Sequence, residues 1–323
     1  MIKYYTLFCK ILKYLLTALI VSSVNISYSQ DAILSQFFSS PIFLNPAFAG
    51  TSEGYRLVLN YRNHPLNEAS NFSFINVSGD AFIPELYGAI GLMVNSDYQG
   101  GMTWKNQIAA TYAYHLQVSR DWHINFGAQA GYLRRDLFWG NLEFADPSQP
   151  PPENHWKHTA DFATGVLAYS DFIYGGFAAH HLTRPKESWF GEERLPIKYT
   201  AHIGFNIEPR KNRRANTLRY DYFISPNIIF QSQGRFQRIN YGLYAGIASV
   251  MAGVWFRQDL KNHNAIVFLI GFTQQNLRFG YSYDYSLSGF TNRTHGVHEI
   301  SLAFDLIRED QKMRKKIFDG IKF

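Results

Sequence analysis

One stretch of the sequence fits a pattern typical of nucleophilic catalysis. Gly50, Ser52 and Gly54 match G-x-S-x-G, in which a serine is exposed on a strained turn between a strand and a helix. Here the preceding residues include Pro46 and do not alternate as a strand does, and an alternating segment rather than a helix follows. We interpret Ser52 as part of a glycine-bounded turn, and we expect no catalytic residue and no enzymatic activity.

Eleven histidines raise the question of a metal site, because imidazole is a common zinc ligand. His180 and His181 are adjacent, so in a strand their side chains point to opposite faces and cannot bind one ion together. His155 and His158 fall in a predicted loop with Asp161 nearby, which leaves a metal hypothesis open. Solvated loop histidines are the simpler interpretation, and we expect neither a metal nor a cofactor.

The first 29 residues have the layout of a cleaved secretory signal. Lys3, Lys10 and Lys13 surround an apolar run at 11–24, and small polar residues precede Gln30. The alternative is a retained membrane helix, but this run is shorter than the roughly 20 residues that a span needs. We therefore predict a signal peptide at 1–29.

Cleavage of this signal would change both the thiol content and the charge. Cys9 is the only cysteine, so the mature chain would have none. Three of the 31 basic residues lie in the signal, which leaves 28 against 25 acidic residues, a net charge of +3. The tail at 308–323 holds six basic and three acidic residues and accounts for that excess. The remaining body lacks the basic face that nucleic-acid binding requires, so no nucleic-acid partner is expected.

Long segments of the chain alternate between apolar and polar residues. From 276 to 287 the odd positions read Leu, Phe, Tyr, Tyr, Tyr and Leu, and polar or small residues take the even positions. The pattern recurs at 104–117, 122–132 and 299–306. Strands of soluble sandwiches average about 5 to 6 residues, whereas strands that cross a membrane need about 9 to 11. The sequence therefore predicts an all-β protein, an antiparallel transmembrane β-barrel of the outer membrane.

Fourteen candidate strands can be placed, and an even number suits a closed bacterial barrel. They form one barrel at 55–306, preceded by a segment at 30–54 and followed by a basic tail at 307–323. The predicted strands span 55–63, 70–82, 86–96, 103–118, 121–135, 160–169, 171–183, 196–208, 217–231, 235–247, 249–259, 264–274, 276–288 and 296–306.

The lengths of the connections predict an orientation, because such barrels have short periplasmic turns and longer outer loops. Starting inside, the short connections fall in the periplasm and the two longest, 136–159 and 184–195, fall outside, with both termini inside. Two connections fit less well: 209–216 is long for the inner side, and 232–234 is short for the outer side.

The two long outer loops are rich in aromatic residues and proline, which supply contact area at low entropic cost. We predict that they contact a partner. The alternative is that these rings pack over the barrel mouth or belong to the outer aromatic belt. The candidate partner-binding residues are Trp139, Phe144, Trp156, Trp189 and Phe190.

The predicted inward face is polar and includes Lys105, His115 and Arg278. Such a face either lines an open channel or fills the lumen with paired charges, and a barrel of this size needs water or a plug inside it. The segment at 30–54 either plugs the lumen or lies in the periplasm as a docking surface. The basic tail forms either a short amphipathic helix or a disordered end.

The segment SQFFSSPIFLNPAFAG at 35–50 resembles the opening of the PorP/SprF family of type IX secretion system membrane proteins. Further resemblance occurs in GVWFR at 253–257, GYSYDY at 280–285 and HEISL at 298–302, so it extends over the whole mature chain. The basic turn at 210–214 and the basic tail after Arg308 are not matched to the family pattern. The N-terminal motif residues are Gln36, Phe37, Asn45, Pro46, Ala47 and Gly50.

This resemblance implies a non-enzymatic outer-membrane component associated with type IX secretion. It implies a role in export or surface attachment of a large secreted adhesin, through binding of the adhesin's C-terminal domain. The implied partners are this client, the secretion machinery and outer-membrane lipid. A rival function, from the polar inward face, is a passive channel or a small-solute transporter.

Overall fold

A computed structural model describes residues 31–52, 54–65, 71–139, 155–186, 189, 192–208, 222–259, 264–287 and 296–307. The predicted signal peptide, the basic turn at 210–214 and the tail after Ile307 lie outside the described residues. Among the residues that the structure describes, no helix is both long enough and apolar enough to cross a membrane.

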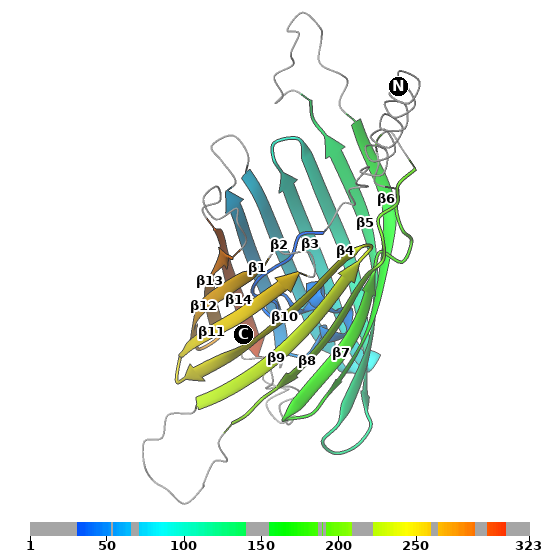
Figure 1. Cartoon of the computed structure of the whole chain (residues 1–323). Helices are drawn as coiled ribbons and strands as arrows, with labels where there is room; N and C mark the ends of the chain where they lie inside the picture. Colours follow the sequence, from blue (N-terminus) through cyan, green and yellow to red (C-terminus); the bar gives the residue numbers. More distant parts are fainter. Residues whose placement is uncertain are drawn as a thin grey trace, which may run out of the picture. The chain divides into compact units, whose positions relative to one another are not determined.

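Fourteen antiparallel strands close into a barrel, as the sequence predicted (Figure 1). The last strand returns to the first, with Gly54 opposite Ile307, so the sheet has no free edge. The strands are β1 (Gly54–Pro65), β2 (Asn71–Ile83), β3 (Gly88–Gln99), β4 (Thr103–Gln117), β5 (His123–Leu137), β6 (His155–Tyr169), β7 (Ile173–His180), β8 (Lys198–Phe205), β9 (Tyr222–Gln233), β10 (Phe236–Ile247), β11 (Val250–Asp259), β12 (Ala265–Gln274), β13 (Leu277–Ser286) and β14 (Val297–Ile307).

Alternation along each strand separates an apolar outer surface from the inner wall. In β3, Leu92 is 61% exposed on the outside, while the next residue, Met93, is 3% exposed inside. Large apolar side chains recur on the outer surface of every strand, which is the band that a bilayer covers.

The connections sort by length between two rims of the barrel. The longest, at 138–154 and 181–197, leave one rim, and two-residue turns at 248–249 and 275–276 lie at the other. We call these the outer rim and the periplasmic rim, following the rule for bacterial barrels. The connection at 206–221 remains long for the periplasmic rim, as the sequence indicated.

A charge on the outer surface of β3 tests this placement. Leu92→Arg is expected to destabilise the barrel by about 2–4 kcal/mol, because a charged side chain is costly near the bilayer midplane. The change can be measured by reversible unfolding of protein folded into lipid vesicles. Val118→Arg, in the turn after β4, is the control and should cost about 0–1 kcal/mol near the interface. Equal losses for the two variants would contradict a lipid-facing Leu92.

Several strand ends differ from the predicted ones. β5 ends at Leu137 and β6 begins at His155, so Trp156 lies in a strand and not in a loop. The outer ends of β5 and β6 do not alternate between apolar and polar residues. The start of β6 is extended because it pairs with the end of β5. β7 ends at His180 instead of 183, because His181 adopts a positive φ of 59° that breaks the ladder.

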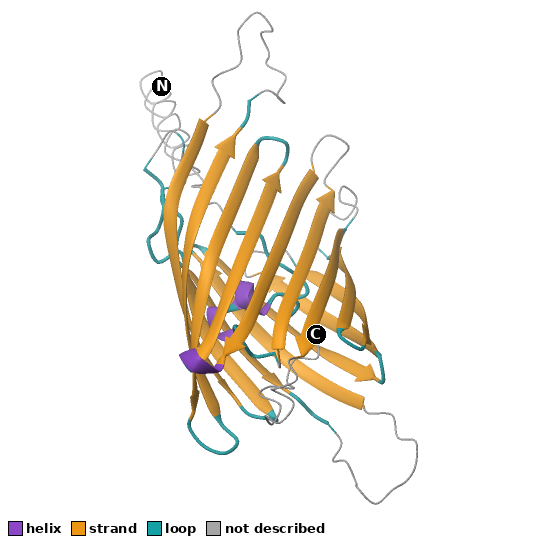
Figure 2. Cartoon of the chain, turned by 180° about the vertical axis from the view of Figure 1, so that it is seen from behind, coloured by secondary structure: helices purple, strands orange, loops and turns teal. Residues whose placement is uncertain are grey.

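Residues 31–52, which we call the luminal segment, lie inside the ring of strands. Figure 2 shows the two short helices α2 (Pro41–Leu44) and η1 (Pro46–Phe48) enclosed by the sheet, whereas η2 (Pro84–Leu86) lies in a turn at its rim. Proline begins each enclosed helix, where its missing N–H costs no hydrogen bond. Nearly every side chain from 34 to 51 is buried.

Candidate functional site

The Asn45-Pro46-Ala47 motif fastens the luminal segment to the wall. The Asn45 side-chain oxygen accepts the Ala47 N–H at 2.9 Å and caps η1. The amide nitrogen of the same side chain donates to the Val166 carbonyl on β6 at 3.0 Å. One side chain therefore starts a helix and binds it to the barrel.

Glycines in the wall let this motif approach the strands closely. A Cβ at Gly165 would lie 2.0 Å from the Asn45 Oδ1 atom, and a Cβ at Gly127 would lie 2.3 Å from the Ala47 nitrogen. No side chain fits at either distance. These glycines on β5 and β6 therefore form a platform for the motif.

A methyl group on this platform should displace the motif. Gly165→Ala is expected to destabilise the protein by about 1–3 kcal/mol, the usual cost of overpacking a tight interior. Equilibrium unfolding in detergent measures this change. Gly175→Ala on β7 is the matched control, because its Cβ would lie 3.3 Å from the nearest atom, the His202 carbonyl oxygen. If Gly165→Ala is as stable as the control, the close approach of Asn45 is contradicted.

Buried carboxylates of the wall bind the backbone of the luminal segment. Glu299 is fully buried and accepts the N–H groups of Ser35 at 2.6 Å and Gln36 at 3.0 Å. Arg62 balances this charge at 3.1 Å and also contacts Asp284 at 3.0 Å. The ion pairs are thus completed by peptide N–H donors.

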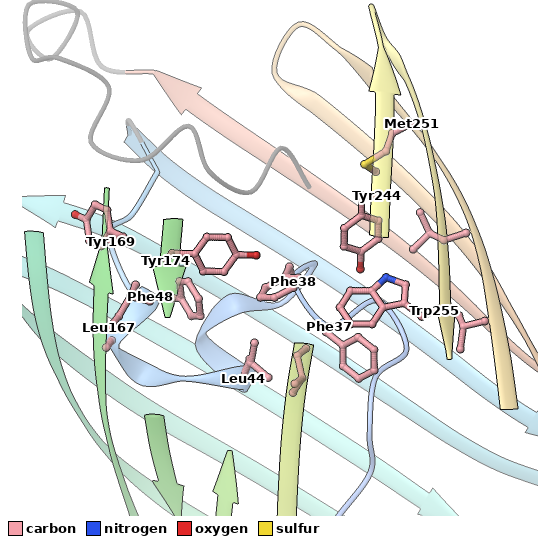
Figure 3. Close-up of a cluster of buried hydrophobic side chains, with 14 residues drawn as sticks. Phe37, Phe38, Leu44, Phe48, Leu167, Tyr169, Tyr174, Tyr244, Met251 and Trp255 are labelled. Carbon is pink, nitrogen blue, oxygen red and sulfur yellow. The ribbon is translucent and has the colours of Figure 1, made fainter. Parts of the chain in front are cut away.

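Aromatic rings fill the middle of the lumen. Figure 3 shows Phe37, Phe38 and Phe48 of the luminal segment facing Tyr174 and Trp255 of the wall. The Phe37 and Trp255 ring centroids lie 4.8 Å apart, within the range of favourable aromatic pairs. This part of the lumen is a packed hydrophobic core.

At the periplasmic end the luminal segment turns into β1. Asp80 accepts the Gly50 N–H at 2.6 Å and holds Arg56 through two contacts of 2.8 Å. Gly50 has a φ of 71°, and a Cβ there would lie 2.2 Å from the Ala89 Cβ atom. Only glycine satisfies both conditions, which explains the last residue of the N-terminal motif.

At the outer end Asp31 lies among cations. Its carboxylate is 2.6 Å from the Lys105 Nζ atom, 2.6 Å from the His181 Nε2 atom and 4.0 Å from the Lys198 Nζ atom. His181, Lys105 and Lys198 therefore surround this carboxylate with positive groups. We call these four residues the mouth cluster.

The position of the mouth cluster corrects one part of the predicted topology. The sequence placed both termini inside, and β1 does begin at the periplasmic rim. The described chain nevertheless starts at the outer rim, where Asp31 lies beside the outer ends of β4 and β8. The reason is that the luminal segment crosses the whole lumen before β1 begins.

Three of the predicted partner-binding residues are described, and all three lie at the outer ends of β5 and β6 or in the connection after β7. Trp156 is 62% exposed at the outer end of β6. Trp189 is half-buried and stacks on His155, with ring centroids 6.2 Å apart, and the Lys157 Nζ atom lies 5.5 Å from its ring. Trp139 is half-buried after β5. Phe144 and Phe190 lie outside the described residues.

The structure also shows where the candidate serine and histidine sites lie. The Ser52 hydroxyl donates to the Gly54 carbonyl at 3.3 Å, in the turn before β1. His155 and His158 lie in β6 three residues apart, so they face opposite sides of the sheet. Within the described ranges, no three histidine, cysteine or acidic residues gather as metal ligands would.

Sequence reasoning missed the groups of the wall that bind the luminal segment. Asp284 and Glu299 occupy polar positions of predicted strands. Both accept hydrogen bonds from Ser35, which is more than two hundred residues away in the sequence, so no local pattern indicates these contacts. One signal was available in β12, where 265–272 reads AIVFLIGF and is apolar on both faces. Apolar residues toward the lumen, such as Val267 and Leu269, require a covering segment.

Comparisons with known proteins agree with this architecture. The family model described as "Type IX secretion system membrane protein PorP/SprF" matches residues 26–304. Among solved structures, the Ralstonia pickettii toluene transporter TbuX is 9% identical with a TM-score of 0.50, covering 82% of this chain and 92% of its own. A Pseudomonas aeruginosa FadL homologue is 11% identical with a TM-score of 0.44, covering 83% and 94%. The likeness to TbuX concerns the fold alone.

A search of curated proteins found no match. The family model nevertheless spans residues 26–304 of the 323, including the Asn45-Pro46-Ala47 motif and thirteen complete strands. The closed barrel and this match place the protein in the outer membrane as a component associated with type IX secretion. The chain belongs to the PorP/SprF family of type IX secretion system membrane proteins.

Proposed function

We propose that this barrel is a non-enzymatic partner of a secreted adhesin, which it binds through the adhesin's C-terminal domain during export or surface attachment. The observation that carries the proposal is the luminal segment itself. Its rings and ion pairs occupy the lumen that a solute channel would need open. A barrel whose interior is packed must act through its rims, and the type IX family supplies the class of client.

The outer rim offers aromatic side chains for such contacts. Trp156 is largely exposed, and Trp189 lies over the inner side of β6, next to Lys157. Tryptophan is enriched among residues that dominate binding energy at protein interfaces. We assign client contact to the outer ends of β5 and β6 and the connection after β7.

Retention of a client by variants of the outer rim tests the proposal. Native membranes are solubilised, the barrel is captured through an affinity tag, and bound chains are identified by mass spectrometry. Wild type should retain a protein with a type IX C-terminal domain. Trp156→Ala and Trp189→Ala should each reduce the retained amount about tenfold or more, the effect of a residue worth 1.4 kcal/mol or above.

A tryptophan at the opposite rim provides the matched control. Trp122 is 45% exposed in the turn before β5, so Trp122→Ala removes the same ring from the periplasmic side. This variant should retain the client as wild type does. If wild type captures no type IX client, or if all three variants behave alike, outer-rim recognition is wrong.

A further inference from the structure

The luminal segment has a direction that follows from its contacts. Asp31 touches Lys105 and Lys198 near the outer ends of β4 and β8. Gly50 touches Asp80 near the periplasmic end of β2. The segment therefore runs from the outer rim inward, and its first described residue lies where extracellular molecules arrive.

Several side chains of the wall bind Asp31. One carboxylate oxygen contacts Lys105 at 2.6 Å, and the other contacts His181 at 2.6 Å and accepts from the Gln233 amide at 3.3 Å. The Asp31 backbone N–H donates to the same Gln233 side chain at 3.2 Å. Groups from β4, from the connection after β7 and from β9 thus converge on one carboxylate and on the peptide that carries it.

The contacts of His181 also show that the groups around Asp31 are positively charged, so the site binds an anion. The second ring nitrogen of His181 lies 2.7 Å from Asp161, so each nitrogen faces a carboxylate. Only the imidazolium form can donate to both at once. With Lys105 and Lys198, the site presents three positive groups, and Asp161 and Asp97 are the other carboxylates that line it. Its two-sided contact with Asp31 suits the paired oxygens of a carboxylate.

Asp31 can leave this site without opening the core. Residues 31–33 are only half-buried, whereas Phe37 and Phe38 behind them are buried in the aromatic cluster. A cavity of about 40 Å³ adjoins Asp31 and is lined by Phe43, Asn95 and Gln129, among others. The cavity leaves room for water or one small group, such as a carboxylate, beside the resident residue.

We propose that Lys105, His181 and Lys198 form a carboxylate-binding site open to the outer rim, and that Asp31 is its exchangeable internal ligand. Departure of Asp31 alone would leave buried cations without their partner, which is strongly unfavourable, whereas exchange for another carboxylate is not. The natural competitor is an acidic group on an extended segment of the secreted client, an identification that rests on the proposed function.

Thiol labelling of the purified full-length barrel tests the exchange. The mature chain lacks cysteine if the signal is cleaved as predicted, so wild type serves as the blank. Ala32→Cys reports release of the mouth, and Ser52→Cys reports the far end of the same segment. Asp31→Asn should raise the rate of maleimide modification at position 32 about tenfold or more and leave position 52 unchanged. Asp31→Glu, which keeps the carboxylate, should restore a slow rate.

Small carboxylates serve as probes in place of the client in the same labelling assay. Millimolar N-acetyl-aspartate amide should accelerate modification of Ala32→Cys several-fold, and N-acetyl-asparagine amide should not. Glycylglycine against glycylglycinamide separates a chain-terminal carboxylate from a side-chain one. Lys105→Gln, checked for a closed barrel by its heat-dependent gel mobility, should abolish the acceleration.

With purified protein, two results would overturn the proposal: equal labelling rates for Asp31→Asn and its parent, or equal acceleration by acids and amides. The labelling assay contains no client, so its rates do not depend on whether the pull-down captures one. The carboxylate site and the proposed function can therefore be contradicted separately. On intact cells, a membrane-impermeant maleimide should label position 32 and spare position 52. Labelling of position 52 alone would reverse the direction of the segment.

Discussion

Deletion of residues 31–51 is expected to turn a closed barrel into an ion-conducting pore. Full-length protein should give no stable current in planar lipid bilayers, because aromatic packing and buried ion pairs fill its lumen. The deleted protein should give stepwise openings, since fourteen strands enclose more space than the wall side chains alone can fill. Single-channel recording measures both.

A synthetic peptide provides the control for this deletion. The peptide corresponding to 31–51 should close the pore when it is added to the deleted barrel, and a scrambled peptide of the same composition should not. Closure by the native peptide alone would show that the deletion left the wall intact. If full-length protein already conducts steadily, the lumen is not sealed, and a passive channel becomes the better function.

The barrel was predictable because its signal is local. Each lipid-facing residue is flanked by lumen-facing ones, so a segment such as 276–287 reports its conformation and its two faces without knowledge of any partner. The outer ends of β5 and β6 were missed for the same reason. Beyond the membrane no apolar face is required, and only pairing with β5 keeps residues such as His155 extended.

The path of the luminal segment was not predictable from local pattern. Its local pattern is compatible with either the lumen or the periplasm, because 35–50 alternates poorly and carries no charge that would indicate its surroundings. Its position depends on contacts between residues far apart in the chain. Ser35 meets Asp284 and Glu299, and Asn45 meets Val166, only after the barrel has closed.

The same contacts explain how a largely polar wall can hold a hydrophobic segment. The rings of the luminal segment face an apolar part of the wall, and its peptide groups face the buried ionic part. A buried charge is tolerated when its partners satisfy it completely. Here that condition includes backbone N–H groups of residues that are not part of the barrel, so the wall and the segment stabilise each other.

Glu299→Ala should therefore be among the most destabilising single substitutions in the described chain. It removes the acceptor of two peptide N–H groups and one of the two carboxylates that Arg62 contacts, all in a buried site. Breaking a buried pair in this way costs about 3–5 kcal/mol. Equilibrium unfolding in urea of vesicle-folded protein measures the loss. Glu299→Gln keeps one acceptor oxygen and should lose less.

An exposed ion pair serves as the control for this substitution. Lys186 and Glu192 lie 2.5 Å apart with side chains 45% and 83% exposed, and Lys186→Ala should leave stability unchanged within error. Glu299→Ala should also produce brief current openings in bilayers, because the segment that it releases is the one whose deletion opens the pore. A variant as stable and as silent as Lys186→Ala would mean that aromatic packing alone retains the segment, and that the buried ion pairs contribute nothing to closure.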